Sequence, residues 1–146
     1  IILKYIDHKE NKMQRLLLTG SNDSYLIGYI DFVILEDIKD IKNVNIKDFF
    51  VYKCFRGKKY GTYILYKLIE MMIKIGVKKI ILEDCSKRYG KNSNIYKNLG
   101  FYYCQINDSE MELNLENYNL DSDIKDIKDI KDIINKDKVN TSLFCF

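Results

Sequence analysis

A short segment that combines glycine with basic residues stands where the sequence pattern changes from strand-like to helical. It reads Arg56-Gly57-Lys58-Lys59-Tyr60-Gly61-Thr62. Glycine lets backbone N–H groups turn toward an anion, the N-terminus of a following helix adds about half a positive charge, and the Arg and Lys side chains add full charges. The segment therefore suits a bound pyrophosphate, although a loop of this kind can also be a plain connection.

The residues before this segment have the pattern of strands. Residues 13–19 and 25–35 are apolar or β-branched runs, and the Gly-Ser-Asn-Asp cluster at 20–23 between them is typical of a hairpin. The polar stretch 36–43 leads to a third expected strand at 46–52. These three runs predict an antiparallel meander.

Helical spacing replaces the strand pattern after the basic segment. Gly76 stands where a helix would end, and the K-I-I-L-E run at 79–83 is typical of a buried strand. Strand, glycine loop, helix and strand together predict a βαβ unit. A short helix capped at 92–94 and ended by Gly100 follows, and residues 101–106 and 110–115 predict two further strands. The apolar positions of the longer helix are Ile64, Leu65, Leu68, Ile69, Met72 and Ile75.

Two segments together resemble motifs of the GNAT superfamily of acyl-CoA-dependent N-acetyltransferases. Arg56, Lys59 and Gly61 occupy the specified positions of the superfamily's Q/R-x-x-G-x-G/A turn, and Lys59 departs from the glycine of that pattern. The superfamily's second motif, Y-x-x-x-G-F, is matched by Tyr96, Gly100 and Phe101.

The resemblance implies an α/β fold with a mixed α+β sheet, the GNAT acyl-CoA N-acyltransferase fold, over residues 1–116. Its antiparallel meander, splayed central strands and CoA-binding βαβ unit would place the pantetheine of acetyl-CoA between strands 47–52 and 79–84. The basic segment and Asn92 would complete the cofactor site. A backbone N–H near Phe50 or Val51 would polarise the thioester carbonyl. Tyr96 would protonate the leaving thiolate, because the pKa values of a phenol (~10) and a thiol (~8.5) make this step only mildly uphill; its alternative is a core aromatic.

The general base would be a carboxylate, because the single histidine, His8, lies far from both motifs. The candidates are Asp48 on the first splayed strand and Glu83 or Asp84 at the end of the second. Each of these carboxylates could equally be an ordinary surface acid.

Within the superfamily, K-I-I-L-E followed by N-x-x-I-Y and L-G-F resembles glucosamine-6-phosphate N-acetyltransferase, whose acidic and asparagine positions match Glu83 and Asn92. An amino-sugar phosphate is therefore the expected acceptor. A protein or peptide amine, N-terminal or lysine, is the alternative, and a non-catalytic CoA-binding or interaction protein is the alternative class. The loop 85–91 is longer than that family usually carries, and few residues precede Met13 to form its N-terminal helices.

Amino-acid composition and net charge limit the class of protein to which the chain can belong. The 146 residues are 47% hydrophobic and 31% charged, which suits one soluble globular domain. A net charge of +3 with scattered lysines argues against a nucleic-acid partner. One His, no Cys-x-x-Cys and no apolar run near ~20 residues argue against a metal and a membrane span. We expect a cytoplasmic protein with reduced, mostly buried thiols, which could form a homodimer.

The last residues, 117–146, differ in kind from the rest. They repeat the triplet Asp-Ile-Lys from Asp123 onward, as do residues 37–42. A three-residue repeat drifts by about 60° per step around a helix, so its isoleucines form no single stripe. We expect a low-complexity extension without a catalytic role, helical if it docks. The chain starts at Ile1 rather than Met, which is consistent with an N-terminally truncated domain.

Overall fold

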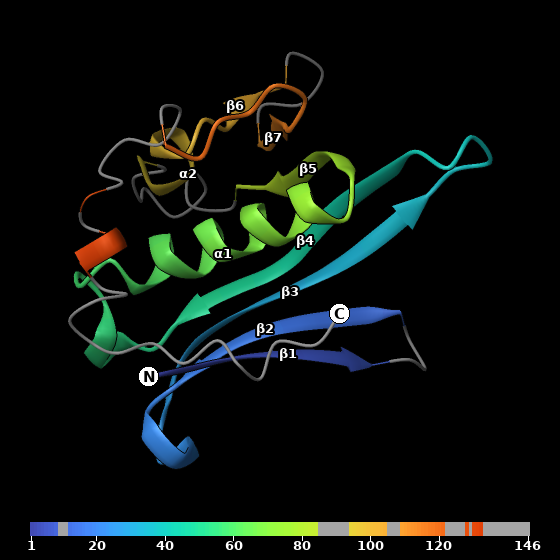
Figure 1. The fold of residues 1–146 in the computed structure, drawn as a ribbon. Coiled ribbons are helices and arrows are strands. Elements are labelled where there is room, and N and C mark those ends of the chain that lie inside the picture. The colour runs from blue at the N-terminus through green and yellow to red at the C-terminus, as the bar shows by residue number, and fades with distance from the viewer. Residues whose placement is uncertain (9–11, 85–93, 105–108, 122–127, 129, 133–146) are drawn as a thin grey trace.

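A seven-stranded mixed sheet with one long helix across its face forms the centre of the molecule (Figure 1). The computed structural model describes residues 1–8, 12–84, 94–104, 109–121, 128 and 130–132. The strand order is β1-β2-β3-β4-β5-β7-β6, and all neighbours are antiparallel except β4 and β5. This arrangement confirms the predicted α/β fold with its meander and βαβ unit. The elements are β1 (Ile2–His8), β2 (Met13–Thr19), η1 (Ser21–Asp23), β3 (Leu26–Glu36), β4 (Lys42–Val51), η2 (Lys53–Phe55), α1 (Tyr60–Lys74), β5 (Val77–Glu83), α2 (Asn94–Asn98), β6 (Tyr102–Tyr103) and β7 (Glu110–Asn114).

Strand β1 was not predicted from the sequence. It pairs along its whole length with β2, and its Leu3 is fully buried opposite Leu18. Four residues, 9–12, connect the two strands. The meander therefore has four strands instead of three.

Strand β4 begins earlier than predicted. It starts at Lys42 rather than at residue 46, and Val44 is fully buried between β3 and β5. The expected connecting stretch is reduced to a tight turn, in which the Asp37 carboxylate accepts the N–H groups of Lys39 (2.8 Å) and Ile41 (3.0 Å). The first residues of β4 are polar and are stabilised by pairing with the strands on both sides. The hydrophobic pattern of the sequence does not indicate such pairing.

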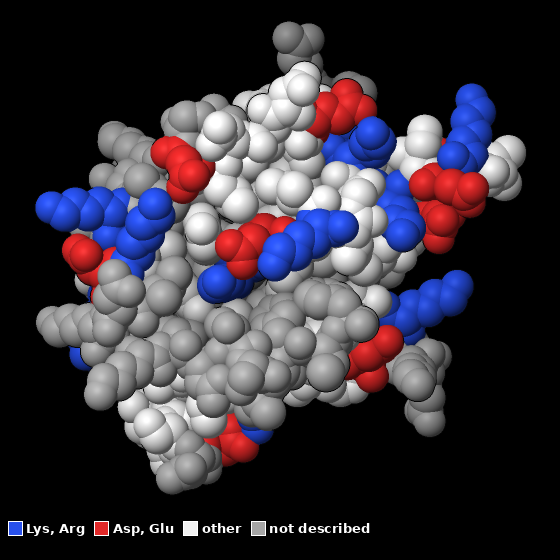
Figure 2. Space-filling model, viewed as in Figure 1, with Lys and Arg blue, Asp and Glu red and all other residues white. Residues whose placement is uncertain are grey.

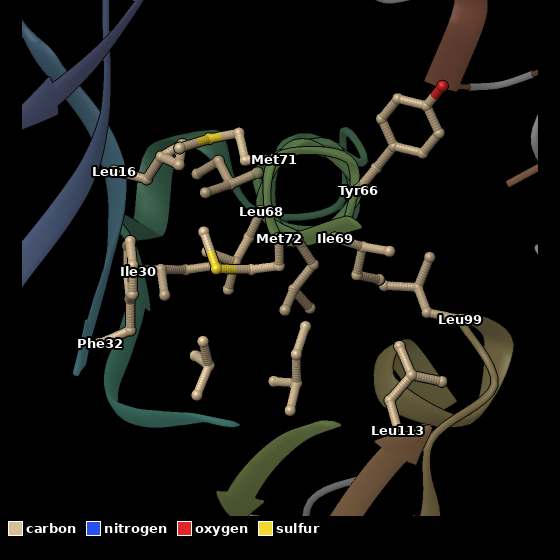
Figure 3. Packing of buried hydrophobic residues seen from close by; sticks show 14 of the residues in the cluster. Leu16, Ile30, Phe32, Tyr66, Leu68, Ile69, Met71, Met72, Leu99 and Leu113 are labelled. Atoms are coloured by element: carbon tan, nitrogen blue, oxygen red, sulfur yellow. The ribbon is translucent and has the colours of Figure 1, made fainter. Parts of the chain in front are cut away.

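The core lies between α1 and the inner face of the sheet, defined here as the face that α1 covers. The buried side chains of α1 point toward two groups of core residues, one on β2 and β3 and one on β7 and the turn after α2 (Figure 3). Because these contacts are entirely apolar, the helix is held by burial rather than by directional bonds. Leu68, Met71 and Met72 meet Leu16, Ile30 and Phe32 of β2 and β3, whereas Ile69 meets Leu99 and Leu113.

The loop before α1 contains left-handed backbone at two positions. Gly57 has φ +80°, which glycine adopts freely, whereas Lys59 has φ 68° and ψ 12°. A side chain at such a position costs about 1–3 kcal/mol. The position where the sequence departs from the glycine of the motif is thus a position whose backbone favours glycine. At the other end, Gly76 with φ +82° follows α1, as predicted.

The described part of the repeat at the end of the chain contributes Ile130 to the core. Residues 128 and 130–132 are helical, and Ile130 is fully buried, whereas Ile38 in the earlier copy of the triplet is 100% exposed. Tyr66 on α1 points toward this segment, which is red in Figure 3, and Lys131 forms an ion pair with Asp121. The described part of the extension is therefore docked.

Two of the four cysteines lie in the described ranges, and both are free thiols. Cys54 is exposed, so the prediction of buried thiols is wrong there; Cys85 and Cys145 lie outside the described residues. Partial burial and the nearby carboxylates of Glu112 and Glu110 raise the pKa of Cys104 to about 11, so this thiol stays protonated at neutral pH.

The two copies of the triplet provide a matched stability test. Ile130→Ala should lower the free energy of unfolding by about 2–4 kcal/mol, because it removes a fully buried side chain. Ile38→Ala, in the same Asp-Ile-Lys context, should change it by less than about 0.5 kcal/mol. Urea unfolding followed by circular dichroism measures both; equal effects would contradict the docking of the extension.

Lys59→Gly should raise the free energy of unfolding by about 0.5–1 kcal/mol. Relief of left-handed strain exceeds the entropy that glycine adds to the unfolded chain. The neighbouring Lys58 is not among the residues with positive φ, so Lys58→Gly should instead destabilise slightly. A lower stability of Lys59→Gly in the same unfolding assay would show that the strain is not relieved.

Candidate functional site

The central strands separate where the site forms. Parallel pairing of β4 with β5 runs from Lys42 and Val77 to Ile46 and Leu82 and goes no further. Beyond that point β4 continues to Val51 with β3 as its strand partner, whereas β5 continues with β7. The predicted splay between the two strands is therefore present.

The backbone of β4 directs alternate residues toward this gap. The Tyr52 N–H donates to the Ile27 carbonyl of β3 at 2.9 Å, and the Phe50 carbonyl lies 2.6 Å from where a Cβ on Gly28 would be, so both residues face β3. Successive residues of a strand point their N–H groups in opposite directions, so those of Phe49 and Val51 face the gap. Of the two predicted positions, the geometry favours Val51 over Phe50. It adds Phe49, which sequence analysis missed because orientation depends on the register with β3.

A cavity of about 570 Å³ opens between the end of β4, the basic loop, the start of α1 and α2. It brings together Tyr96 and all but two of the predicted cofactor residues. Lys58 does not line it, and Asn92 lies outside the described residues. The lining residues are Phe49, Phe50, Val51, Phe55, Arg56, Gly57, Lys59, Tyr60, Gly61, Thr62, Ile95 and Tyr96.

Gly61 allows the start of α1 to approach β4 closely. A Cβ there would lie 3.1 Å from Phe49 Cζ, 3.2 Å from Ile95 Cδ1 and 3.3 Å from Val51 Cγ2, which is tighter than ordinary contact. The N-terminal turn of α1, with the positive end of the helix dipole, therefore borders the cavity directly.

Basic side chains flank the same helix end. Arg56 donates from Nε to the Val51 carbonyl at 2.8 Å and lies over the Phe50 ring at 5.3 Å, while Lys58 lies over the Phe55 ring at 6.0 Å. The bond to Val51 fixes the guanidinium at the cavity and leaves the Val51 N–H directed into the gap. Backbone and side chains together suit an anionic ligand.

The residues of the Tyr96 motif form the C-terminal cap of helix α2. The Phe101 N–H donates to the Tyr96 carbonyl and the Gly100 N–H to that of Lys97, the bond pattern of a Schellman cap, with Gly100 at φ +99°. Phe101 is buried and anchors this end, and the Tyr96 ring lies between Phe101 (6.0 Å) and Phe49 (6.2 Å). The cap thus positions the half-buried Tyr96 beside the residue whose N–H faces the gap.

The predicted carboxylates do not gather around Tyr96. Asp48 lies on the outer face of the sheet, opposite α1, where its Oδ2 accepts the Tyr29 hydroxyl at 2.9 Å. Glu83 lines a second hollow of about 280 Å³ at the point where β4 and β5 separate, together with Lys47 and Glu110. Asp84 is 2% exposed and accepts the Tyr103 hydroxyl at 2.6 Å, so it lines neither hollow.

Charges on the described part of the α1 face are mixed. Figure 2 shows Lys and Arg interspersed with Asp and Glu there, without a single basic patch among the coloured residues. No helix in the described ranges is long and apolar enough to cross a membrane. Within those ranges, no three His, Cys, Asp or Glu side chains lie close enough together to hold a metal ion.

Comparisons with known proteins agree with this geometry. The sequence model of the acetyltransferase (GNAT) family matches residues 3–101, more than half of the chain. No curated protein sequence matches. The fold is similar to those of AtaTR bound with AcCoA (14% identity, 76% of this chain and 73% of that chain, TM-score 0.59), a GNAT-family acetyltransferase from Staphylococcus aureus Mu50 (22%, 75% and 72%, 0.57) and an acetyltransferase from Trypanosoma brucei (19%, 66% and 67%, 0.58). The chain therefore belongs to the acetyltransferase (GNAT) family, and the prediction of an acetyl-CoA-dependent acetyltransferase is confirmed.

Proposed function

We propose that the protein transfers acetyl from acetyl-CoA to a primary amine by direct attack, without a covalent enzyme intermediate. The main support for this proposal is that the basic loop, the gap-facing backbone of β4 and Tyr96 line one cavity. The phosphates of acetyl-CoA would bind at the start of α1 with Arg56 and Lys59. The pantetheine would then extend between β4 and β5 toward Tyr96.

The chemical step uses the two groups that meet at the inner end of this cavity. The amine nitrogen attacks the thioester carbonyl, and the N–H of Phe49 or Val51 stabilises the negative charge that develops on oxygen. When the carbon–sulfur bond breaks, the electron pair leaves on sulfur, and the Tyr96 hydroxyl donates a proton to the thiolate. Phe49 packs against the Tyr96 ring, so its N–H is the better placed of the two.

Removal of the proton from the amine falls to Asp48 or Glu83, directly or through water. An amine with pKa near ~7.7–8.0 needs little help, whereas a lysine side chain near ~10.4 needs more. Asp84 is a poor candidate, because its buried carboxylate is held by Tyr103.

The acceptor has two candidates from the sequence, glucosamine 6-phosphate and a protein or peptide amine. A neighbour with 13% identity and TM-score 0.57, AtaT complexed with acetyl-methionyl-tRNAfMet, adds an amine carried on RNA to the classes worth testing. The cytoplasmic location, the homodimer and the lack of a nucleic-acid partner stay predictions.

Release of free thiol from acetyl-CoA tests the proposed function. We expect release with at least one acceptor from a panel of glucosamine 6-phosphate, simple amines, peptides and aminoacyl-tRNA, and a rise in melting temperature on adding acetyl-CoA. Neither thiol release nor a thermal shift under any condition would refute an acetyl-CoA-dependent enzyme and favour the non-catalytic interaction protein.

Tyr96→Phe should lower kcat by about 10²–10⁴-fold while the KM for acetyl-CoA changes little, because only the proton donor is lost. Tyr102→Phe is the matched control: Tyr102 is 47% exposed, bonds Glu112 and does not line the cavity, so kcat should stay near the wild-type value. Steady-state kinetics of thiol release measures both variants. Undiminished kcat in Tyr96→Phe would exclude Tyr96 as the acid.

A further inference from the structure

Two carboxylates stand directly opposite each other on the outer face of the sheet. Asp31 of β3 and Asp48 of β4 are register partners, an arrangement that is destabilising for like charges. Asp31 has its own counterion, because Arg15 of β2 binds it through two hydrogen bonds of 2.6 and 2.8 Å. The positive charge of Arg15 therefore balances the negative charge of Asp31.

Asp48 has no such counterion among the residues that the structure describes. Its Oδ2 accepts the Tyr29 hydroxyl, and this hydrogen bond raises the pKa of Tyr29 above its ordinary value, so Tyr29 remains a neutral donor. No Lys or Arg in the described ranges forms an ion pair with the exposed Asp48. The tyrosine orients the carboxylate, and Arg15, whose hydrogen bonds go to Asp31, attracts Asp48 only from a distance.

Aromatic rings beside Asp48 already attract cations of the chain itself. The Arg15 guanidinium lies 4.1 Å from the centre of the Tyr29 ring, and that of Arg56 lies 5.3 Å from the centre of the Phe50 ring. The two rings are neighbours, 6.0 Å apart, and Phe50 is 36% exposed. Both guanidinium groups are held by other bonds, to Asp31 and to the Val51 carbonyl, so neither can move to Asp48 without breaking them.

The position of Asp48 suits contact with the acceptor rather than with acetyl-CoA. Asp48 precedes Phe49, about 3.3 Å along the strand, and Phe49 is the residue whose N–H faces the gap beside Tyr96. The loop that suits the phosphates borders the inner-face cavity, whereas Asp48 faces outward. A group bound at Asp48 would therefore approach the thioester from the side opposite the cofactor.

We propose that the acceptor carries a second cationic group besides the attacking amine and that Asp48, with the rings of Tyr29 and Phe50, binds this second cation. The inference rests on the proposed function and specifies its substrate class as di- or polyamines. A phosphate in the same place would face the exposed carboxylate of Asp48, which disfavours an amino-sugar phosphate.

Two amines of equal chain length test this class. Putrescine and butylamine differ by one terminal ammonium group, so their kcat/KM values compare acceptors with and without the second cation. We expect putrescine to be favoured about tenfold, mainly through KM, and glucosamine 6-phosphate to be the poorest of the three. In Asp48→Asn, which keeps an oxygen for Tyr29, the ratio of kcat/KM for putrescine to that for butylamine should fall to about one, through a rise in the KM for putrescine.

The control variant Glu116→Gln removes an exposed carboxylate of the Lys78 ion pair at the opposite end of β5 and should preserve the preference. Equal kcat/KM for the two amines in the wild type, or faster turnover of glucosamine 6-phosphate, would overturn the proposal. An equal fall in kcat for both amines in Asp48→Asn would instead assign Asp48 as the general base.

Calorimetric titration of putrescine into the wild-type protein saturated with CoA separates this proposal from the proposed function. We expect binding that weakens about tenfold in Asp48→Asn. Thiol release without any preference for putrescine refutes only the second-cation site. Absence of both thiol release and acetyl-CoA binding refutes the enzyme, and absence of putrescine binding then refutes the site as well.

Discussion

Loss of pairing between β4 and β5 beyond Ile46 and Leu82 is the constraint on which the other features depend. Up to that pair, backbone groups of both strands are satisfied within the sheet, and α1 covers a continuous apolar face. Beyond it, β4 presents the N–H groups of Phe49 and Val51 to a gap that a ligand can fill, since unpaired backbone groups favour any polar partner. The start of α1, fixed by Gly61, closes the inner side of this gap.

Local signals in the sequence predicted the parts of the site that local structure determines. The glycines before and after α1 and the cap of α2 depend on a few consecutive residues, so the loop at 56–62 and Tyr96 could be located without coordinates. Strand β1 mixes apolar with charged residues and the first residues of β4 are polar, and both are stabilised by neighbouring strands. The choice of Phe49 and Val51 over Phe50 depends on register, which no residue type encodes.

The surroundings of the three candidate carboxylates could not be predicted from the sequence either. Asp48, Glu83 and Asp84 had equal standing in the sequence, but they occupy an outer face with aromatic rings, a hollow at the base of the gap and the buried end of β5. Their chemistry differs because the residues beside them come from different strands, β3 for Asp48, β7 for Glu83 and β6 for Asp84. Only the tertiary arrangement distinguishes an exposed carboxylate such as Asp48 from a buried one such as Asp84.

The docked Ile130 also bears on how the extension can change in length. Because the triplets around it are identical, inserting or deleting one whole triplet presents another isoleucine to the same core position. On a helix, neighbouring isoleucines of this repeat are offset by about 4.5 Å along the axis and by about 60° around it. The extension can therefore gain or lose repeats in steps of three residues while keeping one anchoring isoleucine, whereas a change of one or two residues would bring Asp or Lys to that position.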